Sequence, residues 1–499
     1  MKTILAYACL LLVTTSSEGA DTNDNSRPNV LFIAIDDLND WVGCLDGHPQ
    51  ARTPNLDRLA ERGMLFTNAH CASPACNPSR AAVFSGRMPW KTGVWSNRSK
   101  KLLQRYPDMQ VLPRAFSRSG YVTMGTGKLM HSGKTANRAM FEHHFDVEQR
   151  WSPFTRDAVQ YTQAELLSKG SKNPRHVVAV PGLPAVILPL NRMPSDRRPD
   201  SDSGESFDWG PLEVPDSTMG DAQITDWAIR QLKSRHDRPF FLGVGYYRPH
   251  IPLWAPRKYF DRFSEAPGRL PPVRTEDLHD LSETARKWAI EPVTAGLHAT
   301  VAEHDQWQAA VEAYLACTTF VDHQVGRLLE ALDNTDTGHN TVIVLWSDHG
   351  WHLGEKQHWG KWTGWERSTR VPLIIAPPQE DADRFAPGGT RCDQPVSLID
   401  LYPTLADLCG VPISPDLDGQ SLLPVLRDPG ARLRPGVMTS FDQGNVSFRT
   451  QHWRYLRYAD GSEELYDHRK DPREWKNLAA DPASAPVLTE LRRQADPGS

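Results

Sequence analysis

The sequence lacks an excess of charge of either sign. It has 56 Lys and Arg against 61 Asp and Glu, a net charge of −5 over 499 residues. A basic surplus of the kind that binds nucleic acid is therefore missing, and so is an acidic run typical of a disordered tail. Hydrophobic residues make up 39% of the chain, which at this length is enough for a large core. We expect a globular protein with no nucleic-acid partner.

Long hydrophobic runs are also missing. The apolar stretch near the start, ILAYACLLLV, follows Lys2 and is about half the length that a membrane span requires. A short apolar segment of this kind, followed by Thr, Ser, Gly and Ala, is typical of a secretory signal peptide. We expect residues 1–20 to be this peptide, cleaved near Gly19 or Ala20, and we expect no membrane span. The protein would then be secreted or periplasmic, or lysosomal if its source is eukaryotic.

Cysteine is scarce, with seven in the chain, and Cys9 lies in the predicted signal peptide. If Cys76 is consumed chemically, as argued below, an odd number of mature cysteines remains. A full disulfide framework is therefore not expected. The pairing that we predict, if one forms, joins Cys392 and Cys409.

Three continuous apolar runs predict parallel strands that are buried on both faces. They cover residues 29–35, 239–245 and 340–346, and a shorter strand is predicted at 120–124. Helical patterns at 54–62, 220–234 and 306–332 alternate with them. This order predicts an α/β fold with a doubly wound sheet flanked by helices. Residues 168–218 are rich in Pro, Arg, Ser and Asp, and we expect a long insertion there.

The last part of the chain has a different pattern. Residues 452–458 and 463–466 flank Asp460-Gly461, which predicts a β-hairpin, and polar residues at the end look helical. We therefore expect a catalytic α/β domain over 28–432 and a smaller C-terminal α+β subdomain over 433–499.

Cys76 opens the stretch Cys-Asn-Pro-Ser-Arg, which leads into a run of small residues. This pattern predicts a thiol at the N-terminus of a helix, where the amide dipoles favour negative charge and lower a thiol pKa. The alternative is a buried structural cysteine before a turn.

Two of the predicted strands, more than 300 residues apart, each end in a pair of metal-ligand residues. Asp36-Asp37 follows the first strand, and Asp348-His349 follows the strand at 340–346. Because ligands gather at the carboxyl ends of strands in open α/β sheets, the pairs could meet. Three carboxylates would suit Ca²⁺ or Mg²⁺ better than zinc. Taken singly, either pair could be an ordinary cap or turn.

Three more motifs carry candidate catalytic residues. Lys128 and His131 lie just past the strand at 120–124, three residues apart, although a solvated turn would also explain them. His250 lies between two prolines in Arg-Pro-His-Ile-Pro, which restricts its backbone. Lys361 ends the run Gly-Glu-Lys-Gln-His-Trp-Gly-Lys.

Together these motifs resemble those of the type I sulfatases, within the alkaline phosphatase superfamily. The order D-D, C-x-P-S-R, G-K-x-x-H, R-P-H-x-P, S-D-H-G and a later lysine is similar to the iduronate-2-sulfatase-like branch, over about residues 29 to 480. The Asp348-His349 form is also found in choline-sulfatase-like and phosphonate-hydrolase-like relatives. Phe84-Ser85-Gly86 departs mildly from the usual Leu-Thr-Gly.

The resemblance implies an alkaline-phosphatase-like fold and a role for each motif. Metal ligands would be Asp36, Asp37, Asp348, His349 and residue 76, holding one divalent cation, Ca²⁺ or else Mg²⁺. Cys76 would be oxidised to formylglycine by a formylglycine-generating or sulfatase-maturating enzyme. Arg80 and Lys128 would neutralise negative charge and His131 would take a proton. His250 and Lys361 would bind sulfate and protonate the leaving alcohol.

The function implied is removal of sulfate from a sulfated saccharide. Phosphonate, phosphodiester or choline-sulfate hydrolysis on the same site is an alternative, and a non-catalytic binder of sulfated glycans is a more distant one. Four tryptophans near the last motif could stack on sugar rings or could pack in the core: Trp351, Trp359, Trp362 and Trp365.

Overall fold

The computed structural model describes residues 27–131, 134–147, 159–160, 176–178, 186–193, 206–291 and 296–496. The predicted signal peptide and much of the predicted insertion at 168–218 lie outside these ranges. Within them, no helix combines the length and the apolar character that crossing a membrane would need.

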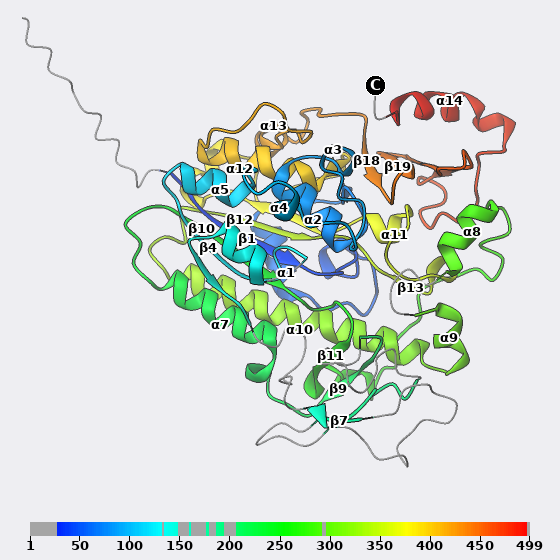
Figure 1. Cartoon of the computed structure of the whole chain (residues 1–499), viewed down its shortest axis with the longest axis horizontal. Coiled ribbons are helices and arrows are strands. Elements are labelled where there is room, and N and C mark those ends of the chain that lie inside the picture. The colour runs from blue at the N-terminus through cyan, green and yellow to red at the C-terminus, as the bar shows by residue number, and fades with distance from the viewer. Residues whose placement is uncertain are drawn as a thin grey trace, which may run out of the picture.

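An eight-stranded mixed sheet forms the centre of the molecule, in the order β16-β2-β15-β12-β1-β10-β4-β5 (Figure 1). β1, β12, β10, β4 and β5 run parallel, whereas β15 is antiparallel to β12 and β2. The strands are β1 Asn29–Ile35, β2 Met64–Phe66, β4 Val122–Gly127, β5 His143–Phe145, β10 Phe240–Tyr246, β12 Thr341–Ser347, β15 Leu373–Ala376 and β16 Arg391–Cys392. Every residue of β1, β10 and β12 is buried, as the apolar runs predicted.

Helices cover both faces of this sheet because alternate side chains of each buried strand point to opposite sides. Val30, Phe32 and Ala34 pack with α2 (Cys76–Ser85), α5 (Leu112–Arg118), α12 (Leu401–Cys409) and α13 (Leu423–Arg427). Leu31 and Ile33 pack with α1 (Pro54–Arg62), α7 (Gly220–Leu232) and α10 (Trp307–Asp333) on the other face (Figure 1). The predicted doubly wound α/β fold is confirmed.

A third apolar cluster, apart from those on the two faces of the sheet, lies beside the first half of α10. There β9 (Trp209–Leu212) pairs with β11 (Leu253–Pro256), and the cluster includes Trp351 and Trp359. Trp362 and Trp365 are also buried, at 6% and 1% exposure, so none of the four tryptophans presents a face for sugar stacking. The core-packing alternative is therefore the correct one.

The remaining helices and strands are short. They are α3 Pro89–Thr92, α4 Leu102–Arg105, α6 Lys134–Met140, α8 Glu283–Ile290, α9 His298–Glu303, α11 Glu366–Thr369, β3 Ala69–His70, β6 Val159–Gln160, β7 His176–Val178, β8 Val186–Leu188, β13 His352–Leu353, β14 Trp359–Gly360 and β17 Val396–Ser397.

The C-terminal part forms a separate four-stranded antiparallel sheet with α14 (Ala485–Gln494). Its strands are β18 Gly436–Ser440, β19 Val446–Thr450, β20 Trp453–Arg457 and β21 Glu463–Asp467. β20 and β21 form the predicted hairpin. This sheet contacts the segment before α2, where Ser440 N donates to Ala72 O at 2.9 Å and Thr439 Oγ1 donates to Cys71 O at 2.6 Å. The C-terminal sheet thus packs close to the start of α2.

The predicted bridge between Cys392 and Cys409 is wrong, because both are free thiols. Cys392 belongs to the edge strand β16 and Cys409 to the end of α12, and each is at most 3% exposed within the hydrophobic core. Burial raises the pKa of both thiols, that of Cys409 to about 12. Each thiol behaves as a small apolar side chain in this packing.

Candidate active site

Four parallel strands deliver polar residues to one edge of the central sheet. Asp36 follows β1, Lys128 follows β4, Arg248 follows β10 by one residue, and Asp348 follows β12. Because β1 pairs with both β10 and β12, and β10 pairs with β4, the carboxyl ends of the four strands are neighbours. The buried strands are rigid, so the residues that follow them are held in place.

Cys76 enters this edge from the start of α2. Ala75 before it is extended, Pro78 lies in the first turn, where its missing N–H costs no hydrogen bond, and Gly86 ends the helix with φ 66°. The Cys76 thiol is fully buried. Its sulfur lies 3.0 Å from Lys361 Nζ, 3.4 Å from His349 Nε2 and 3.6 Å from Lys128 Nζ. The geometry therefore surrounds one thiol with three cationic or cation-forming groups.

These neighbours decide the ionisation of the thiol. Burial alone would raise the pKa of Cys76, but Lys128, Lys361 and His349 lower it well below its usual range. By contrast, burial raises the pKa of the Cys71 thiol, five residues earlier. The surroundings of position 76 thus favour a negatively charged side chain. A structural cysteine, the alternative considered from the sequence, would not need such surroundings.

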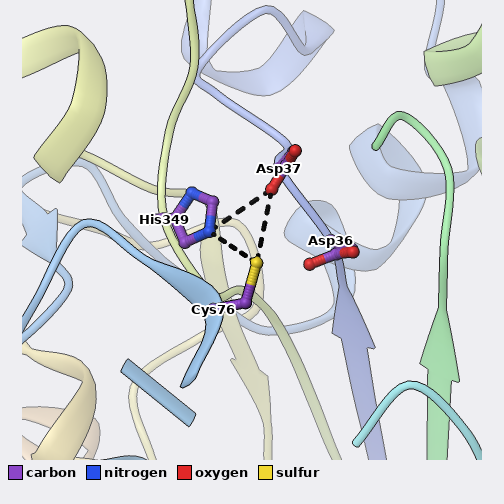
Figure 2. A group of neighbouring side chains, drawn as sticks. All are labelled: Asp36, Asp37, Cys76 and His349. Atoms are coloured by element: carbon purple, nitrogen blue, oxygen red, sulfur yellow. Dashed lines mark hydrogen bonds and ion pairs between the residues drawn. The ribbon is translucent and has the colours of Figure 1, made fainter. Parts of the chain in front are cut away.

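A cluster of four potential metal ligands lies at the same point: Asp36, Asp37, Cys76 and His349 (Figure 2). One ligand atom from each lies within 4.8 Å of the others. Asp37 Oδ1 is 3.3 Å from His349 Nε2 and 3.9 Å from the sulfur. Asp37 Oδ2 is buried without a hydrogen-bond partner among the described residues. An orphaned carboxylate oxygen beside further oxygen and nitrogen donors fits a divalent cation.

Asp348 lies next to this cluster, but its carboxylate is held by other groups. Oδ2 accepts from Arg80 Nε at 2.8 Å and Oδ1 accepts from Asp37 N at 3.1 Å. Oδ2 is also 3.6 Å from His349 Nε2. Burial alone would lower the pKa of His349, but the neighbouring Asp348 carboxylate raises it to about 9. Asp348 can therefore join the ligands only by sharing its oxygens with Arg80.

Three buried cations pair with the three carboxylates. Arg80 binds both Asp36 and Asp348, Lys128 donates to Asp36, and Lys361 Nζ lies 2.7 Å from Asp37 Oδ1. Burial would lower the pKa of Lys361, but Asp37 and Cys76 raise it above its usual range. Such pairs are stable when buried only because the partners satisfy each other. The carboxylates therefore hold all three side chains in place around the cluster.

The two predicted histidines lie at the rim. His131 interacts with the Cys76 thiol, and burial lowers its pKa. His250 lies between two cis peptide bonds, Arg248-Pro249 and Ile251-Pro252, and its Nε2 lies 3.8 Å from Asp37 Oδ2. Its Nδ1 contacts Ile251 O at 2.5 Å. His250 is thus oriented with Nε2 toward the cluster.

The sequence analysis missed two residues that position these groups. Tyr314, on α10, donates from its hydroxyl to Asp37 O and accepts from Asn39 N, each at 2.8 Å. Asp221, at the start of α7, accepts from Tyr247 N at 2.8 Å and from Arg248 N at 2.9 Å. Each lies far along the chain from the turn that it holds, so no local pattern could have shown it.

Comparisons with known proteins show the family to which this chain belongs. The sulfatase family model matches residues 28–411, and the model of the N-sulphoglucosamine sulphohydrolase C-terminal region matches 354–497. A sulfatase from Formosa agariphila is 33% identical over 487 residues, covering 96% of this chain and 89% of its own. Iduronate 2-sulfatase of Mus musculus is 29% identical, over 83% of this chain and 73% of its own.

The fold can be compared with a solved structure as well. The phosphonate monoester hydrolase of Agrobacterium radiobacter superposes with a TM-score of 0.69 and 22% identity, covering 94% of each chain. At that identity the likeness concerns the fold alone, which is the alkaline-phosphatase-like fold that the motifs predicted. With the family match over most of its length, this chain belongs to the sulfatase family and is a sulfuric ester hydrolase.

Proposed function

We propose that this enzyme removes sulfate from a sulfated saccharide, using a formylglycine formed from Cys76 as its nucleophile. The observation that carries the proposal is the position of the Cys76 sulfur, 3.0 Å from Lys361 Nζ and 3.4 Å from His349 Nε2, at the start of α2. Cations that would flank a bound sulfate lie around this one side chain, and so do the ligands that would hold a metal. The motif also resembles the one at which sulfatases are oxidised.

The modified side chain explains why the site needs these residue types. A hydrated aldehyde at position 76 offers two hydroxyls: one attacks sulfur as the S–O bond to the alcohol breaks, and the other then loses its proton and expels sulfate, which restores the aldehyde. His131 is the residue that we assign to remove that proton. Lys128 and Lys361 would stabilise the charge on the sulfate oxygens. His250 would protonate the departing alcohol oxygen.

A calcium ion is the metal that we propose for the site. Asp36, Asp37, Asp348, His349 and residue 76 would hold it, with Asp348 keeping its contact to Arg80. A bound divalent cation would supply positive charge that favours an ionised hydroxyl at position 76. The three carboxylates support Ca²⁺ over zinc, and Mg²⁺ is the alternative.

The substrate class rests on the relatives rather than on the site alone. Iduronate 2-sulfatase is a relative over 83% of this chain, and its name refers to an acidic sugar, so we propose an acidic sulfated sugar as the substrate. Phosphonate and choline-sulfate hydrolysis remain the rival activities, because they could use the same cluster. A non-catalytic glycan binder is disfavoured, since a binder would not need the buried thiol to be activated.

Two further proposals concern the maturation and the export of the protein. A formylglycine-generating or sulfatase-maturating enzyme would oxidise Cys76, which requires an unfolded chain because the thiol is fully buried in the fold. Export by the predicted signal peptide would place the mature enzyme outside the cytoplasm. N-terminal sequencing of secreted protein would test the export, and a start at Met1 would contradict it.

Mass analysis of active protein tests the nucleophile. The peptide that contains residue 76 should carry formylglycine, and Cys76→Ala should lose turnover of a sulfated sugar while retaining its fold. Cys409→Ala is the matched control, because it removes a buried thiol that lies outside the cluster, and it should retain turnover. Active protein with an intact thiol at position 76 would refute the mechanism.

Removal of metal tests the cofactor. Treatment with a chelator should abolish activity, and addition of Ca²⁺ should restore it better than Mg²⁺ or Zn²⁺. Asp37→Ala should lower the bound metal measured by elemental analysis, because its unpartnered Oδ2 lies at the cluster. Full activity in protein shown to be free of metal would exclude the proposal.

A further inference from the structure

A short loop wraps around the start of α2, next to Cys76. Asn77 N donates to Asn97 Oδ1 at 2.9 Å, and Asn77 Nδ2 donates to Ser96 O at 2.9 Å and to Ser99 O at 3.2 Å. Three hydrogen bonds therefore tie residues 96–99 to the residue that follows Cys76 in sequence. Any group fixed to this loop is also fixed relative to the nucleophile.

Lys101 is such a group. Its Nζ donates to Asn97 O at 3.0 Å, and its side chain is part-buried. In the part of the chain that the structure describes, no Asp or Glu oxygen lies within 4.0 Å of this ammonium. Lys128 and Lys361, by contrast, each pair with a carboxylate of the metal cluster. Lys101 is thus a cation near Cys76 without a carboxylate partner among the described residues.

The electrostatic surroundings agree with this position. Burial lowers the pKa of Lys101, while Cys76 raises it and Lys128 lowers it, and Lys101 in turn lowers the pKa of His131. These interactions place Lys101 within electrostatic reach of the reacting groups. They do not make it a partner of the scissile sulfate, which already has nearer cations.

The loop around Lys101 is cationic throughout. Residues 93–107 contain four Lys or Arg and no Asp or Glu, and the side chains of Arg98 and Lys100 are exposed. A protein whose net charge is −5 thus has an acid-free basic segment next to the start of α2. Such a segment attracts anionic substrates and raises their local concentration.

We propose that Lys101 binds a second anionic group on the sugar that carries the scissile sulfate. The group is a carboxylate or a second sulfate, so the natural substrate is a doubly charged saccharide unit rather than a neutral sugar with one sulfate. Lys101 therefore selects the substrate and takes no part in bond breaking. This inference rests on the proposed function and specifies its substrate class.

Two matched pairs of substrates test it with the mature, metal-loaded enzyme. One pair is a methyl glycoside of a 2-sulfated hexuronate and its carboxyl-reduced hexose counterpart. The other is a disulfated glucosamine and the corresponding monosulfated sugar. In Lys101→Gln, kcat/KM for the doubly charged member should fall about 10-fold more than for its partner, through KM, because a charge-assisted hydrogen bond is lost. The pair that responds identifies carboxylate or sulfate as the ligand.

Two further variants separate recognition from folding. Lys101→Arg should keep most of the preference, since it retains the charge, and Lys100→Gln should keep it fully, since that side chain points to solvent. The melting temperature of Lys101→Gln should match the unsubstituted protein. If an active enzyme shows the same preference with Lys101 and with Gln at 101, the inference is wrong. If the unsubstituted enzyme hydrolyses no sulfate ester, the proposed function fails first.

Discussion

Asp37 has an unfavourable backbone conformation that orients its carboxylate toward the cluster. Its φ is 60°, in the left-handed region that costs a non-glycine residue about 1 to 2 kcal/mol. Tyr314 Oη and the Asp348 carboxylate bind its backbone O and N, and these bonds offset that cost. As a result, Oδ1 points to Lys361 and His349, and Oδ2 is left open. The strain at this position supports a metal-binding role.

Substitution of His250 should separate proton donation from sulfate binding. If Nε2 protonates the leaving oxygen, His250→Ala should slow hydrolysis of a sugar sulfate about 10²–10⁴-fold, the usual range for general acid catalysis. A nitrophenyl sulfate should lose far less, because nitrophenolate leaves without a proton. The measurement is kcat for both substrates.

Lys361→Ala is the comparison for this experiment. Lys361 lies 3.0 Å from the Cys76 sulfur, where it can contact the sulfate that both substrates share, so both should be slowed to a similar degree. Equal losses on both substrates for His250→Ala would mean that His250 binds sulfate and donates no proton.

At the scale of elements, the sequence predicted those parts of the site that follow a strand end or open a helix. Asp36 and Asp348 each follow a buried apolar run, and such runs are visible in sequence because both faces of a parallel strand must be apolar. Lys128 follows the shorter strand that was predicted at 120–124. Tyr314 could not be predicted, since it lies on the buried face of a helix where an aromatic residue is expected anyway. The location of Lys101 near Cys76 could not be predicted either, because it depends on how the segment 96–99 packs against the start of α2.

The close approach of β4 and β10 gives an element-scale prediction. Gly127 ends β4 with φ 70°, and a Cβ there would lie 1.9 Å from Gly245 O. That carbonyl also accepts from Lys128 N at 2.8 Å. Gly127→Ala should therefore push the strands apart and displace Lys128, lowering both the melting temperature and kcat. Overpacking of this kind typically costs about 1–3 kcal/mol.

Gly461 provides the matched control, because its φ is 86° and a Cβ there would meet nothing within 4 Å. Gly461→Ala should incur only the backbone strain and should leave kcat unchanged. Equal effects of the two substitutions on kcat would show that strand spacing does not position Lys128.

At the scale of the whole molecule, the C-terminal sheet holds the segment that carries Lys361. Arg454, on β20, is fully buried and donates from Nη1 to Gly364 O at 2.9 Å. It also pairs with Glu366, and its Nε lies 2.6 Å from Glu474 Oε1. Trp365 Nε1 donates to Glu464 Oε2 at 2.8 Å. The hairpin was predicted from Asp460-Gly461. This network was not, because the residues that it joins across the two sheets lie 88 to 99 positions apart in the sequence.

Replacement of Arg454 should test this coupling. Burial alone would raise the pKa of Glu366 and Glu474. Arg449, His468 and Arg454 lower the pKa of Glu366, and Arg454 and His468 lower that of Glu474. Arg454→Ala leaves two buried carboxylates poorly compensated, a change that typically costs about 3–5 kcal/mol. Thermal unfolding should therefore occur at a lower temperature, and kcat should fall because Lys361 is less well held.

The pH dependence of stability follows from the same shifts. Carboxylates with a lowered native pKa stabilise the fold above their ordinary pKa of 4.5, and this contribution is lost as the pH falls through the native values. Without Arg454 the native pKa values rise, so acid unfolding should begin at a higher pH than in the unsubstituted protein. Lys287→Ala, which breaks an exposed pair with Glu283 on α8, should change neither the acid midpoint nor kcat. An unchanged acid midpoint in Arg454→Ala would show that Arg454 does not contribute to the stability of the fold through these carboxylates.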